Sequence, residues 1–141
     1  MTRIFLPSTG RDAWQALLAN PALHWKPGKS AYECASSWEA AAATPRGLPS
    51  SIARVLDSHP TTAQAELVLA IPELQVDLPG GGHASQNDLW ALLRATSGTI
   101  SLCLEAKSGE TLGPLVSEWL ADAPSASGKR KRLAFLCERL V

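Results

Sequence analysis

The sequence has few cysteines, and they are neither paired nor close together. Cys34, Cys103 and Cys137 form no Cys-x-x-Cys pair, and their number is odd. Both facts argue against a zinc site built on cysteine pairs and against a disulfide framework. A reducing, cytoplasmic location is therefore expected.

Net charge and long apolar runs are also lacking. The 13 basic and 13 acidic residues cancel, so no overall field draws the protein to nucleic acid or to a membrane surface. No apolar stretch approaches the ~18 residues of a membrane-spanning helix, and the first ten residues lack the pattern of a secretory signal peptide. We expect a globular protein without membrane association.

Motifs of nucleophilic and nucleotide-binding enzymes are missing too. No histidine stands in a strand-to-helix elbow, so Ser-His-Asp and Cys-His chemistry have no candidate. Segment 78–83, LPGGGH, lacks the Gly-Lys-Ser/Thr ending of a phosphate-binding loop, and a flexible turn is the preferred interpretation. His83 at its end is a weak candidate for a proton shuttle.

The chain's 141 residues predict a single domain, 1–141. The composition, 45% hydrophobic and 18% charged, is that of an ordinary globular protein. Three parts follow one another: a helical N-terminal part (1–60), a strand core (65–108) and C-terminal helices (111–141). This order predicts an α+β fold in which helices cover a central, mostly antiparallel sheet.

Helical spacing marks three segments of the N-terminal part, 10–20, 30–43 and 49–59. The second begins with Ser30 and carries Glu33 three residues on, the pattern of a capping box. Its expected buried stripe is Ala31, Cys34 or Ala35, Trp38 and Ala42, with Glu39 at the edge. The inward-facing residues expected elsewhere are Trp14, Leu17, Leu18, Ile52, Val55 and Leu56.

Branched apolar residues dominate from residue 65. Segment 65–78 is expected to be a strand in which Pro72 forces a bulge, an edge position or a break. Segments 87–95 and 99–109 predict a β-hairpin that spans 88–107 and turns at Gly98. Two helices are expected after it, with Leu112, Leu115, Val116, Trp119 and Leu120 buried in the first.

Charge alternates with apolar residues in the stretch SLCLEAKSGE, residues 101–110. Side chains two apart on a strand share a face, so Glu105 and Lys107 are expected on one face. With a two-residue turn at Ser97 and Gly98, Asp88 lies opposite Lys107; a three-residue turn would send Asp88 to the other face. Either this is an exposed ion pair at a strand end, or it is the charged half of a metal site.

Asp88, followed after a strand and turn by Glu105-Ala106-Lys107, resembles the Asp…Glu-x-Lys signature of the PD-(D/E)XK restriction-endonuclease-like superfamily. More closely, segments 24–41, 69–82, 85–92, 113–120 and 128–137 resemble a bacterial family with that nuclease-like core and no assigned reaction. The resemblance covers nearly the whole chain.

The resemblance implies a Mg²⁺-dependent nuclease, with Mn²⁺ as a substitute ion and nucleic acid as substrate. It makes Asp88, Glu105 and the carbonyl of Ala106 metal ligands and Lys107 the catalytic cation. Glu39 is the candidate for the acid that the first core helix supplies to such sites. Gln86 and Glu110 are weaker candidates.

The sequence departs from that pattern in two places. Asn87, not proline, precedes Asp88, and no further strand is found after the hairpin. A second copy or another partner could complete the sheet edge. The alternative function is therefore a catalytically inactive, nuclease-like binding or assembly module. The basic run from Lys129 to Arg132 is interpreted first as a solvated helix start, and second as a phosphate contact.

Overall fold

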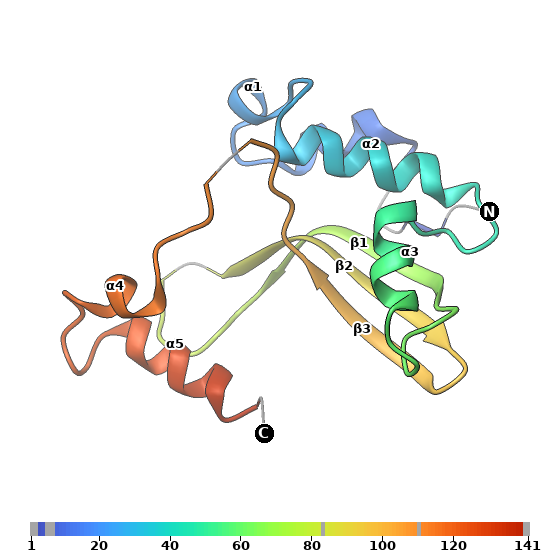
Figure 1. Cartoon of the computed structure of the whole chain (residues 1–141). Helices are drawn as coiled ribbons and strands as arrows, with labels where there is room; N and C mark the ends of the chain where they lie inside the picture. Colours follow the sequence, from blue (N-terminus) through green and yellow to red (C-terminus); the bar gives the residue numbers. More distant parts are fainter. Residues whose placement is uncertain (1–2, 5–7, 83, 110, 140–141) are drawn as a thin grey trace. The chain divides into compact units, whose positions relative to one another are not determined.

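The computed structural model describes residues 3–4, 8–82, 84–109 and 111–139 (Figure 1). The chain divides into two compact units. The first comprises Met1–Leu74 and Asn87–Glu110, and the second comprises Gln75–Gln86 and Thr111–Val141.

The first unit begins with two short helices. Residues Arg11–Leu17 form a 3₁₀ helix, η1, and Pro21–His24 form a short α-helix, α1, outside the helical segments that the sequence predicts. Asn20 explains α1, because its side chain accepts a hydrogen bond from the backbone N–H of Leu23 at 3.3 Å and Pro21 supplies a preset φ at the first helical position.

Helix α2, Ser30–Ala42, is the longest helix described. Its buried residues are Cys34, Ala35, Trp38 and Ala41, which confirms the middle of the predicted stripe, whereas Ala31 and Ala42 are half-buried. The predicted capping box is wrong, because Lys29 occupies the N-cap position and Ser30 already lies inside the helix. The Glu33 carboxylate instead accepts a hydrogen bond from the backbone N–H of Gly28 at 2.7 Å.

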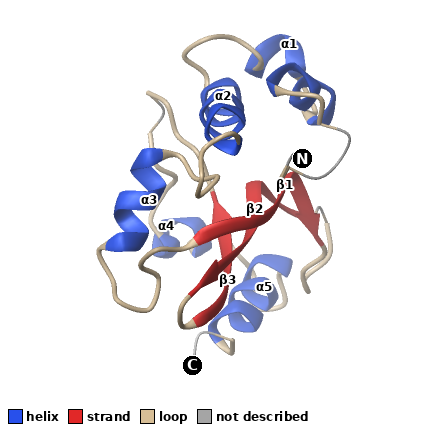
Figure 2. Cartoon of the chain, turned by 90° about the vertical axis from the view of Figure 1, so that its right-hand side faces the viewer, coloured by secondary structure: helices blue, strands red, loops and turns tan. Residues whose placement is uncertain are grey.

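Three strands, β1 (Glu66–Val76), β2 (Ser85–Ala95) and β3 (Gly98–Leu104), form one antiparallel sheet in the order β1-β2-β3 (Figure 2). The predicted α+β class is confirmed. Pro72 lies in β1, and β2 is the central strand of the sheet. Proline has no backbone N–H to donate to a neighbouring strand, so it is disfavoured in a central strand. On the other side of β1, Ile4 forms a single parallel bridge with Ala70.

The hairpin of β2 and β3 turns one residue earlier than expected. Ala95 pairs with Gly98, so Thr96 and Ser97 form the turn, and the predicted pairing of Thr96 with Thr99 is wrong. The Ser97 hydroxyl donates a hydrogen bond to the carbonyl of Thr61 in the loop before β1. This contact, 36 residues away in the chain, fixes the turn residues and is not visible in the local sequence.

The core of the first unit lies between the sheet and the helices α2 and α3 (Ser50–Asp57). Alternate residues of β2, namely Leu89, Ala91 and Leu93, are fully buried, as period-2 patterning requires. Trp38 of α2 and Leu56 of α3 belong to the same buried cluster. Val55 was expected to face inward, but 69% of its surface is exposed.

The second unit contains α4 (Val116–Leu120) and α5 (Gly128–Cys137). The first of the two expected C-terminal helices begins only at Val116, because Pro114 disfavours a helical conformation in the residue before it. The predicted burial of Leu112, Leu115 and Val116 is wrong, since each is more than half exposed. No helix within the described ranges is long and apolar enough to cross a membrane.

Candidate active site

Asp88 lies on β2, one residue before the buried Leu89, and is half-buried itself. The ladder between β2 and β3 ends at the pair of Leu89 and Leu104. Beyond that pair, the backbone N–H of Ala106 donates a hydrogen bond to Oδ2 of Asp88 at 2.6 Å. The aspartate is thereby fixed beside the Glu-x-Lys stretch.

Glu105 and Lys107 follow β3 and do not belong to it, because the strand ends at Leu104. The expectation that both lie within a strand is wrong: Ala106 bonds to a side chain where a ladder would bond to backbone. Lys107 Nζ forms an ion pair with Glu105 Oε1, and the two side chains are 35% and 59% exposed. Solvent therefore reaches this pair.

The turn expected at Ser97 and Gly98 would also have placed Trp90 opposite Glu105, but Trp90 pairs with Cys103. Its indole Nε1 donates a hydrogen bond to Oγ of Ser101 at 2.9 Å. The observed pairing differs from the expected one by two residues along β3. Because side chains alternate between the faces of a strand, a shift by two residues leaves each side chain on the face that was expected. Asp88 consequently still reaches residues 105–107, although through Ala106 and not opposite Lys107.

Glu39 binds the N-terminal segment. Its Oε1 accepts hydrogen bonds from Nε1 of the buried Trp14 at 2.7 Å and from the hydroxyl of Ser8 at 2.5 Å. The carboxylate thus holds the N-terminal segment and η1 against α2. Both partners of this oxygen precede α2 in the chain, so neither bond links Glu39 to the acids of the hairpin.

Sequence reasoning missed Glu73. It follows Pro72 in β1 and has a φ of 53°, which is uncommon for a residue other than glycine. Burial, followed by the negative charges of Asp88 and Glu73, raises the pKa of the Cys34 thiol to about 12. Both carboxylates therefore lie within electrostatic range of the same residue of α2. The only local signal was an acid placed directly after a strand proline.

The weaker candidates add little. Gln86 is exposed and accepts a long hydrogen bond, 3.4 Å, from Nε2 of Gln75. Glu110 and His83 lie outside the described residues.

The donors near Asp88 fit a hard cation. Two carboxylates and the Ala106 carbonyl supply the oxygen ligands that Mg²⁺ prefers, and Mg²⁺ usually keeps several waters. Within the described ranges no group of three histidine, cysteine, aspartate or glutamate side chains is spaced to hold a metal. An ion here would therefore depend on two carboxylates, backbone oxygen and water.

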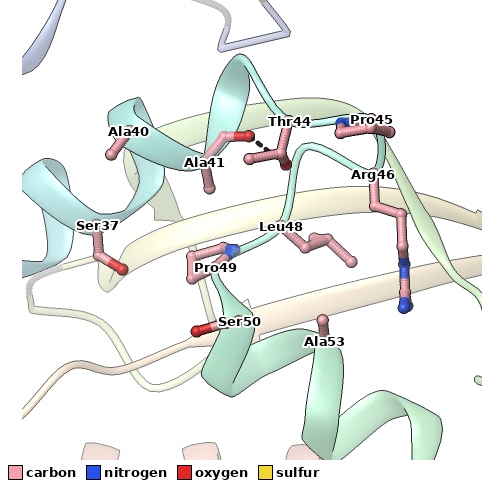
Figure 3. A pocket seen from close by; sticks show the side chains of 10 residues that line it. All are labelled: Ser37, Ala40, Ala41, Thr44, Pro45, Arg46, Leu48, Pro49, Ser50 and Ala53. Carbon is pink, nitrogen blue, oxygen red and sulfur yellow. Dashed lines mark hydrogen bonds between the residues drawn. The ribbon is translucent and has the colours of Figure 1, made fainter.

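The first unit also has a cavity of about 530 Å³, whose lining residues are distant in sequence from Asp88 and Glu105. Its lining comes from the end of α2, the following loop and the start of α3, and consists mostly of small and apolar residues (Figure 3). Arg46 stands at its edge, but its guanidinium is held by two hydrogen bonds to Asp57 at 2.8 and 3.0 Å. The cavity therefore offers no evident catalytic group.

Comparison with known proteins gives one match. No curated protein and no solved structure matches the chain. The model of a protein family described as a domain of unknown function, DUF6946, matches residues 7–141. Because that match covers nearly the whole sequence, the chain belongs to the DUF6946 family.

Proposed function

We propose that this protein is a Mg²⁺-dependent nuclease of restriction-endonuclease-like fold, which hydrolyses phosphodiester bonds at Asp88, Glu105 and Lys107. The single observation that carries the proposal is the 2.6 Å hydrogen bond from the Ala106 N–H to Asp88 Oδ2. It brings an acid from β2 to the acid and the amine that follow β3. A helix, an antiparallel strand series and then helices, in that order, support the fold assignment.

Asp88, Glu105 and the Ala106 carbonyl would hold the ion. When bound, Mg²⁺ would polarise the scissile phosphate and lower the pKa of its water. The hydrogen bond from the Ala106 N–H to Oδ2 orients the whole carboxylate of Asp88, including Oδ1. Glu105, the more exposed of the ion-paired side chains, would turn from Lys107 towards the ion.

Lys107 would then act as the cation of the site. An ammonium group beside the scissile phosphate orients the attacking water and stabilises the charge that develops in the transition state. Its present partner, Glu105, keeps the ammonium at this position before substrate binds.

Glu39 as a metal ligand stays a prediction. Its Oε1 already accepts two hydrogen bonds, from Trp14 and Ser8. We therefore assign Glu39 first to holding the N-terminal segment, and metal binding would have to use its other oxygen or break these bonds.

A cleavage assay tests the proposal. Supercoiled plasmid, single-stranded DNA and single-stranded RNA are incubated with the protein in Mg²⁺, in Mn²⁺ and in EDTA. Metal-dependent cleavage is expected, and Lys107→Gln should lower its rate by about 10²–10³-fold, as loss of one transition-state donor does. Arg94→Gln is the matched control, because Arg94 also forms an exposed ion pair, with Glu66 at 2.9 Å. Equal cleavage by the Lys107 variant, or cleavage in EDTA, would contradict the proposal.

The second candidate is a nuclease-like module that binds nucleic acid without cutting it. The direct ion pair of Glu105 with Lys107 favours this candidate, because each neutralises the other where an active site needs both charges. Binding of an oligonucleotide without cleavage in either metal would select it.

A further inference from the structure

The second unit contains a small cavity of about 210 Å³ that the proposed active site does not use. The residues that line it are Gly80, Gly81, Trp119, Gly128, Lys129 and Arg132. All six belong to the same compact unit, so the cavity is complete within it.

Two glycines bring the cavity walls together. A Cβ atom built on Gly80 would collide with the carbonyl oxygen of Gly128, and one built on Gly128 would collide with the carbonyl oxygen of Gly80. The loop at Gly80 and the start of α5 are therefore in direct backbone contact. Side chains are excluded at both positions, as at sites where two backbones approach closely.

Lys129 is held at this cavity. Its Nζ lies 5.3 Å from the ring centroid of Trp119 and donates a hydrogen bond to the Trp119 carbonyl at 3.0 Å. An ammonium group has three donors, so this bond leaves donor capacity for a ligand. Arg132 is three residues further along α5 and lines the same cavity, as residues at this spacing share a helix face.

Both charged residues that line the cavity, Lys129 and Arg132, are basic, although the whole chain is neutral. Segment 125–137 contains Lys129, Arg130, Lys131 and Arg132 and no acidic residue. An anion in this cavity would be attracted by both cations.

We propose that this cavity binds a backbone phosphate of single-stranded nucleic acid, with Lys129 and Arg132 contacting its oxygens. The inference rests on the proposed function, because it assigns part of the substrate's binding to the second unit. The volume is below the roughly 300–1,000 Å³ of small-molecule sites, which favours one phosphate of a longer strand over a whole nucleotide. Trp119 adds an aromatic surface of the kind on which unpaired bases stack.

Binding is measured in EDTA, so that failure of the metal site cannot affect the result. The anisotropy of a fluorescent single-stranded oligonucleotide is followed at several salt concentrations for three proteins: wild type, Lys129→Gln/Arg132→Gln, and the charge-matched control Lys131→Gln/Arg139→Gln. The cavity variant should bind about tenfold or more weakly, and its log–log salt slope should fall by about 0.7 for each phosphate that the protein no longer neutralises. The affinity of the control variant for the oligonucleotide should stay within threefold of the wild-type affinity.

An NMR titration of the wild type covers the case in which the cavity variant does not fold. Addition of the oligonucleotide should shift the backbone amides of Gly80, Gly81 and Lys129, and inorganic phosphate should do so only at far higher concentration. Equal binding by the cavity variant and its control, or unshifted amides, overturns the inference. An affinity for inorganic phosphate equal to that for the oligonucleotide also overturns it. Tighter binding to phosphatidylserine vesicles than to the oligonucleotide does so as well. Loss of cleavage with oligonucleotide binding intact refutes the proposed nuclease activity alone.

Discussion

Asp88 and Ala106 are joined across the end of the hairpin by a hydrogen bond of 2.6 Å between the Ala106 N–H and Asp88 Oδ2. The alternation of side chains along the two strands does not predict this contact, because it joins a side chain to a backbone N–H. A hydrogen bond to a charged group contributes about 1.5–3 kcal/mol to stability. The same contact fixes the backbone that presents the Glu105 and Lys107 side chains.

Asp88→Ala should therefore lower the free energy of unfolding by about 1.5–3 kcal/mol and increase amide hydrogen exchange at Ala106. Asp88→Asn keeps an acceptor oxygen and should cost less. Urea denaturation and NMR-detected exchange give the two readouts. Unchanged exchange at Ala106 in the alanine variant would show that the bond is not formed in solution.

Glu39 is expected to stabilise the fold through Trp14. Glu39→Leu removes the acceptor for the buried indole N–H, which should cost about 1–3 kcal/mol, whereas Glu39→Gln should cost less. A double-mutant cycle with Trp14→Phe isolates the coupling between the two side chains. Zero coupling, combined with a loss of Mg²⁺ affinity in Glu39→Gln, would instead make Glu39 a metal ligand.

Asp57 should make stability depend on pH. Hydrogen bonds from the Arg46 guanidinium and then from the Gln64 N–H hold the pKa of Asp57 below its ordinary value. Because the folded pKa lies below the unfolded one, the stabilisation is present above roughly pH 4 and is lost as pH falls through the folded pKa.

Urea denaturation at pH 6 and at pH 2.5 measures this effect. The difference in stability between wild type and Asp57→Asn should be larger at pH 6 than at pH 2.5. Asp12→Asn is the control, since Asp12 forms a single exposed ion pair with Arg11. A difference that does not change with pH would exclude the proposed linkage.

The three thiols should differ in reactivity. Cys103 and Cys137 are exposed, whereas Cys34 is buried and its pKa is raised to about 12 by burial and by the charges of Asp88 and Glu73. Iodoacetamide at pH 8, followed by peptide mass spectrometry, should label the first two and spare Cys34 until the protein unfolds. Because the folded pKa is the higher one, stability should also fall as pH rises from about 9 towards 12. Labelling of Cys34 at the rate of Cys103 would contradict its burial.

Strong patterns predicted the elements that pack the core. The apolar stripe of α2 and the alternation of Leu89, Ala91 and Leu93 both reflect burial against a neighbouring layer. Val55 and Leu115 fit the same helical spacing and are exposed, because spacing states which residues share a face and not whether anything covers it.

The geometry around the candidate residues differs from the one expected from the sequence, and their role at a metal site stays a prediction. The Asp…Glu-x-Lys spacing singled out Asp88, Glu105 and Lys107. The expected register was wrong by two residues, and such a shift does not move a side chain to the other face of the sheet. The turn was misplaced because Ser97 bonds to Thr61, a tertiary contact. Glu39 looked like a stripe-edge acid, and only the fold shows Trp14 donating to it.

The most direct test of the proposed site is calorimetric titration with Mg²⁺ and Mn²⁺. Four proteins are compared: wild type, Asp88→Asn, Glu105→Gln and the control Glu66→Gln, whose carboxylate also belongs to an exposed ion pair. One binding event is expected in the wild type and the control, with at least tenfold weaker binding in the other two. Equal binding by all four proteins, or by none, would contradict a metal site at Asp88 and Glu105.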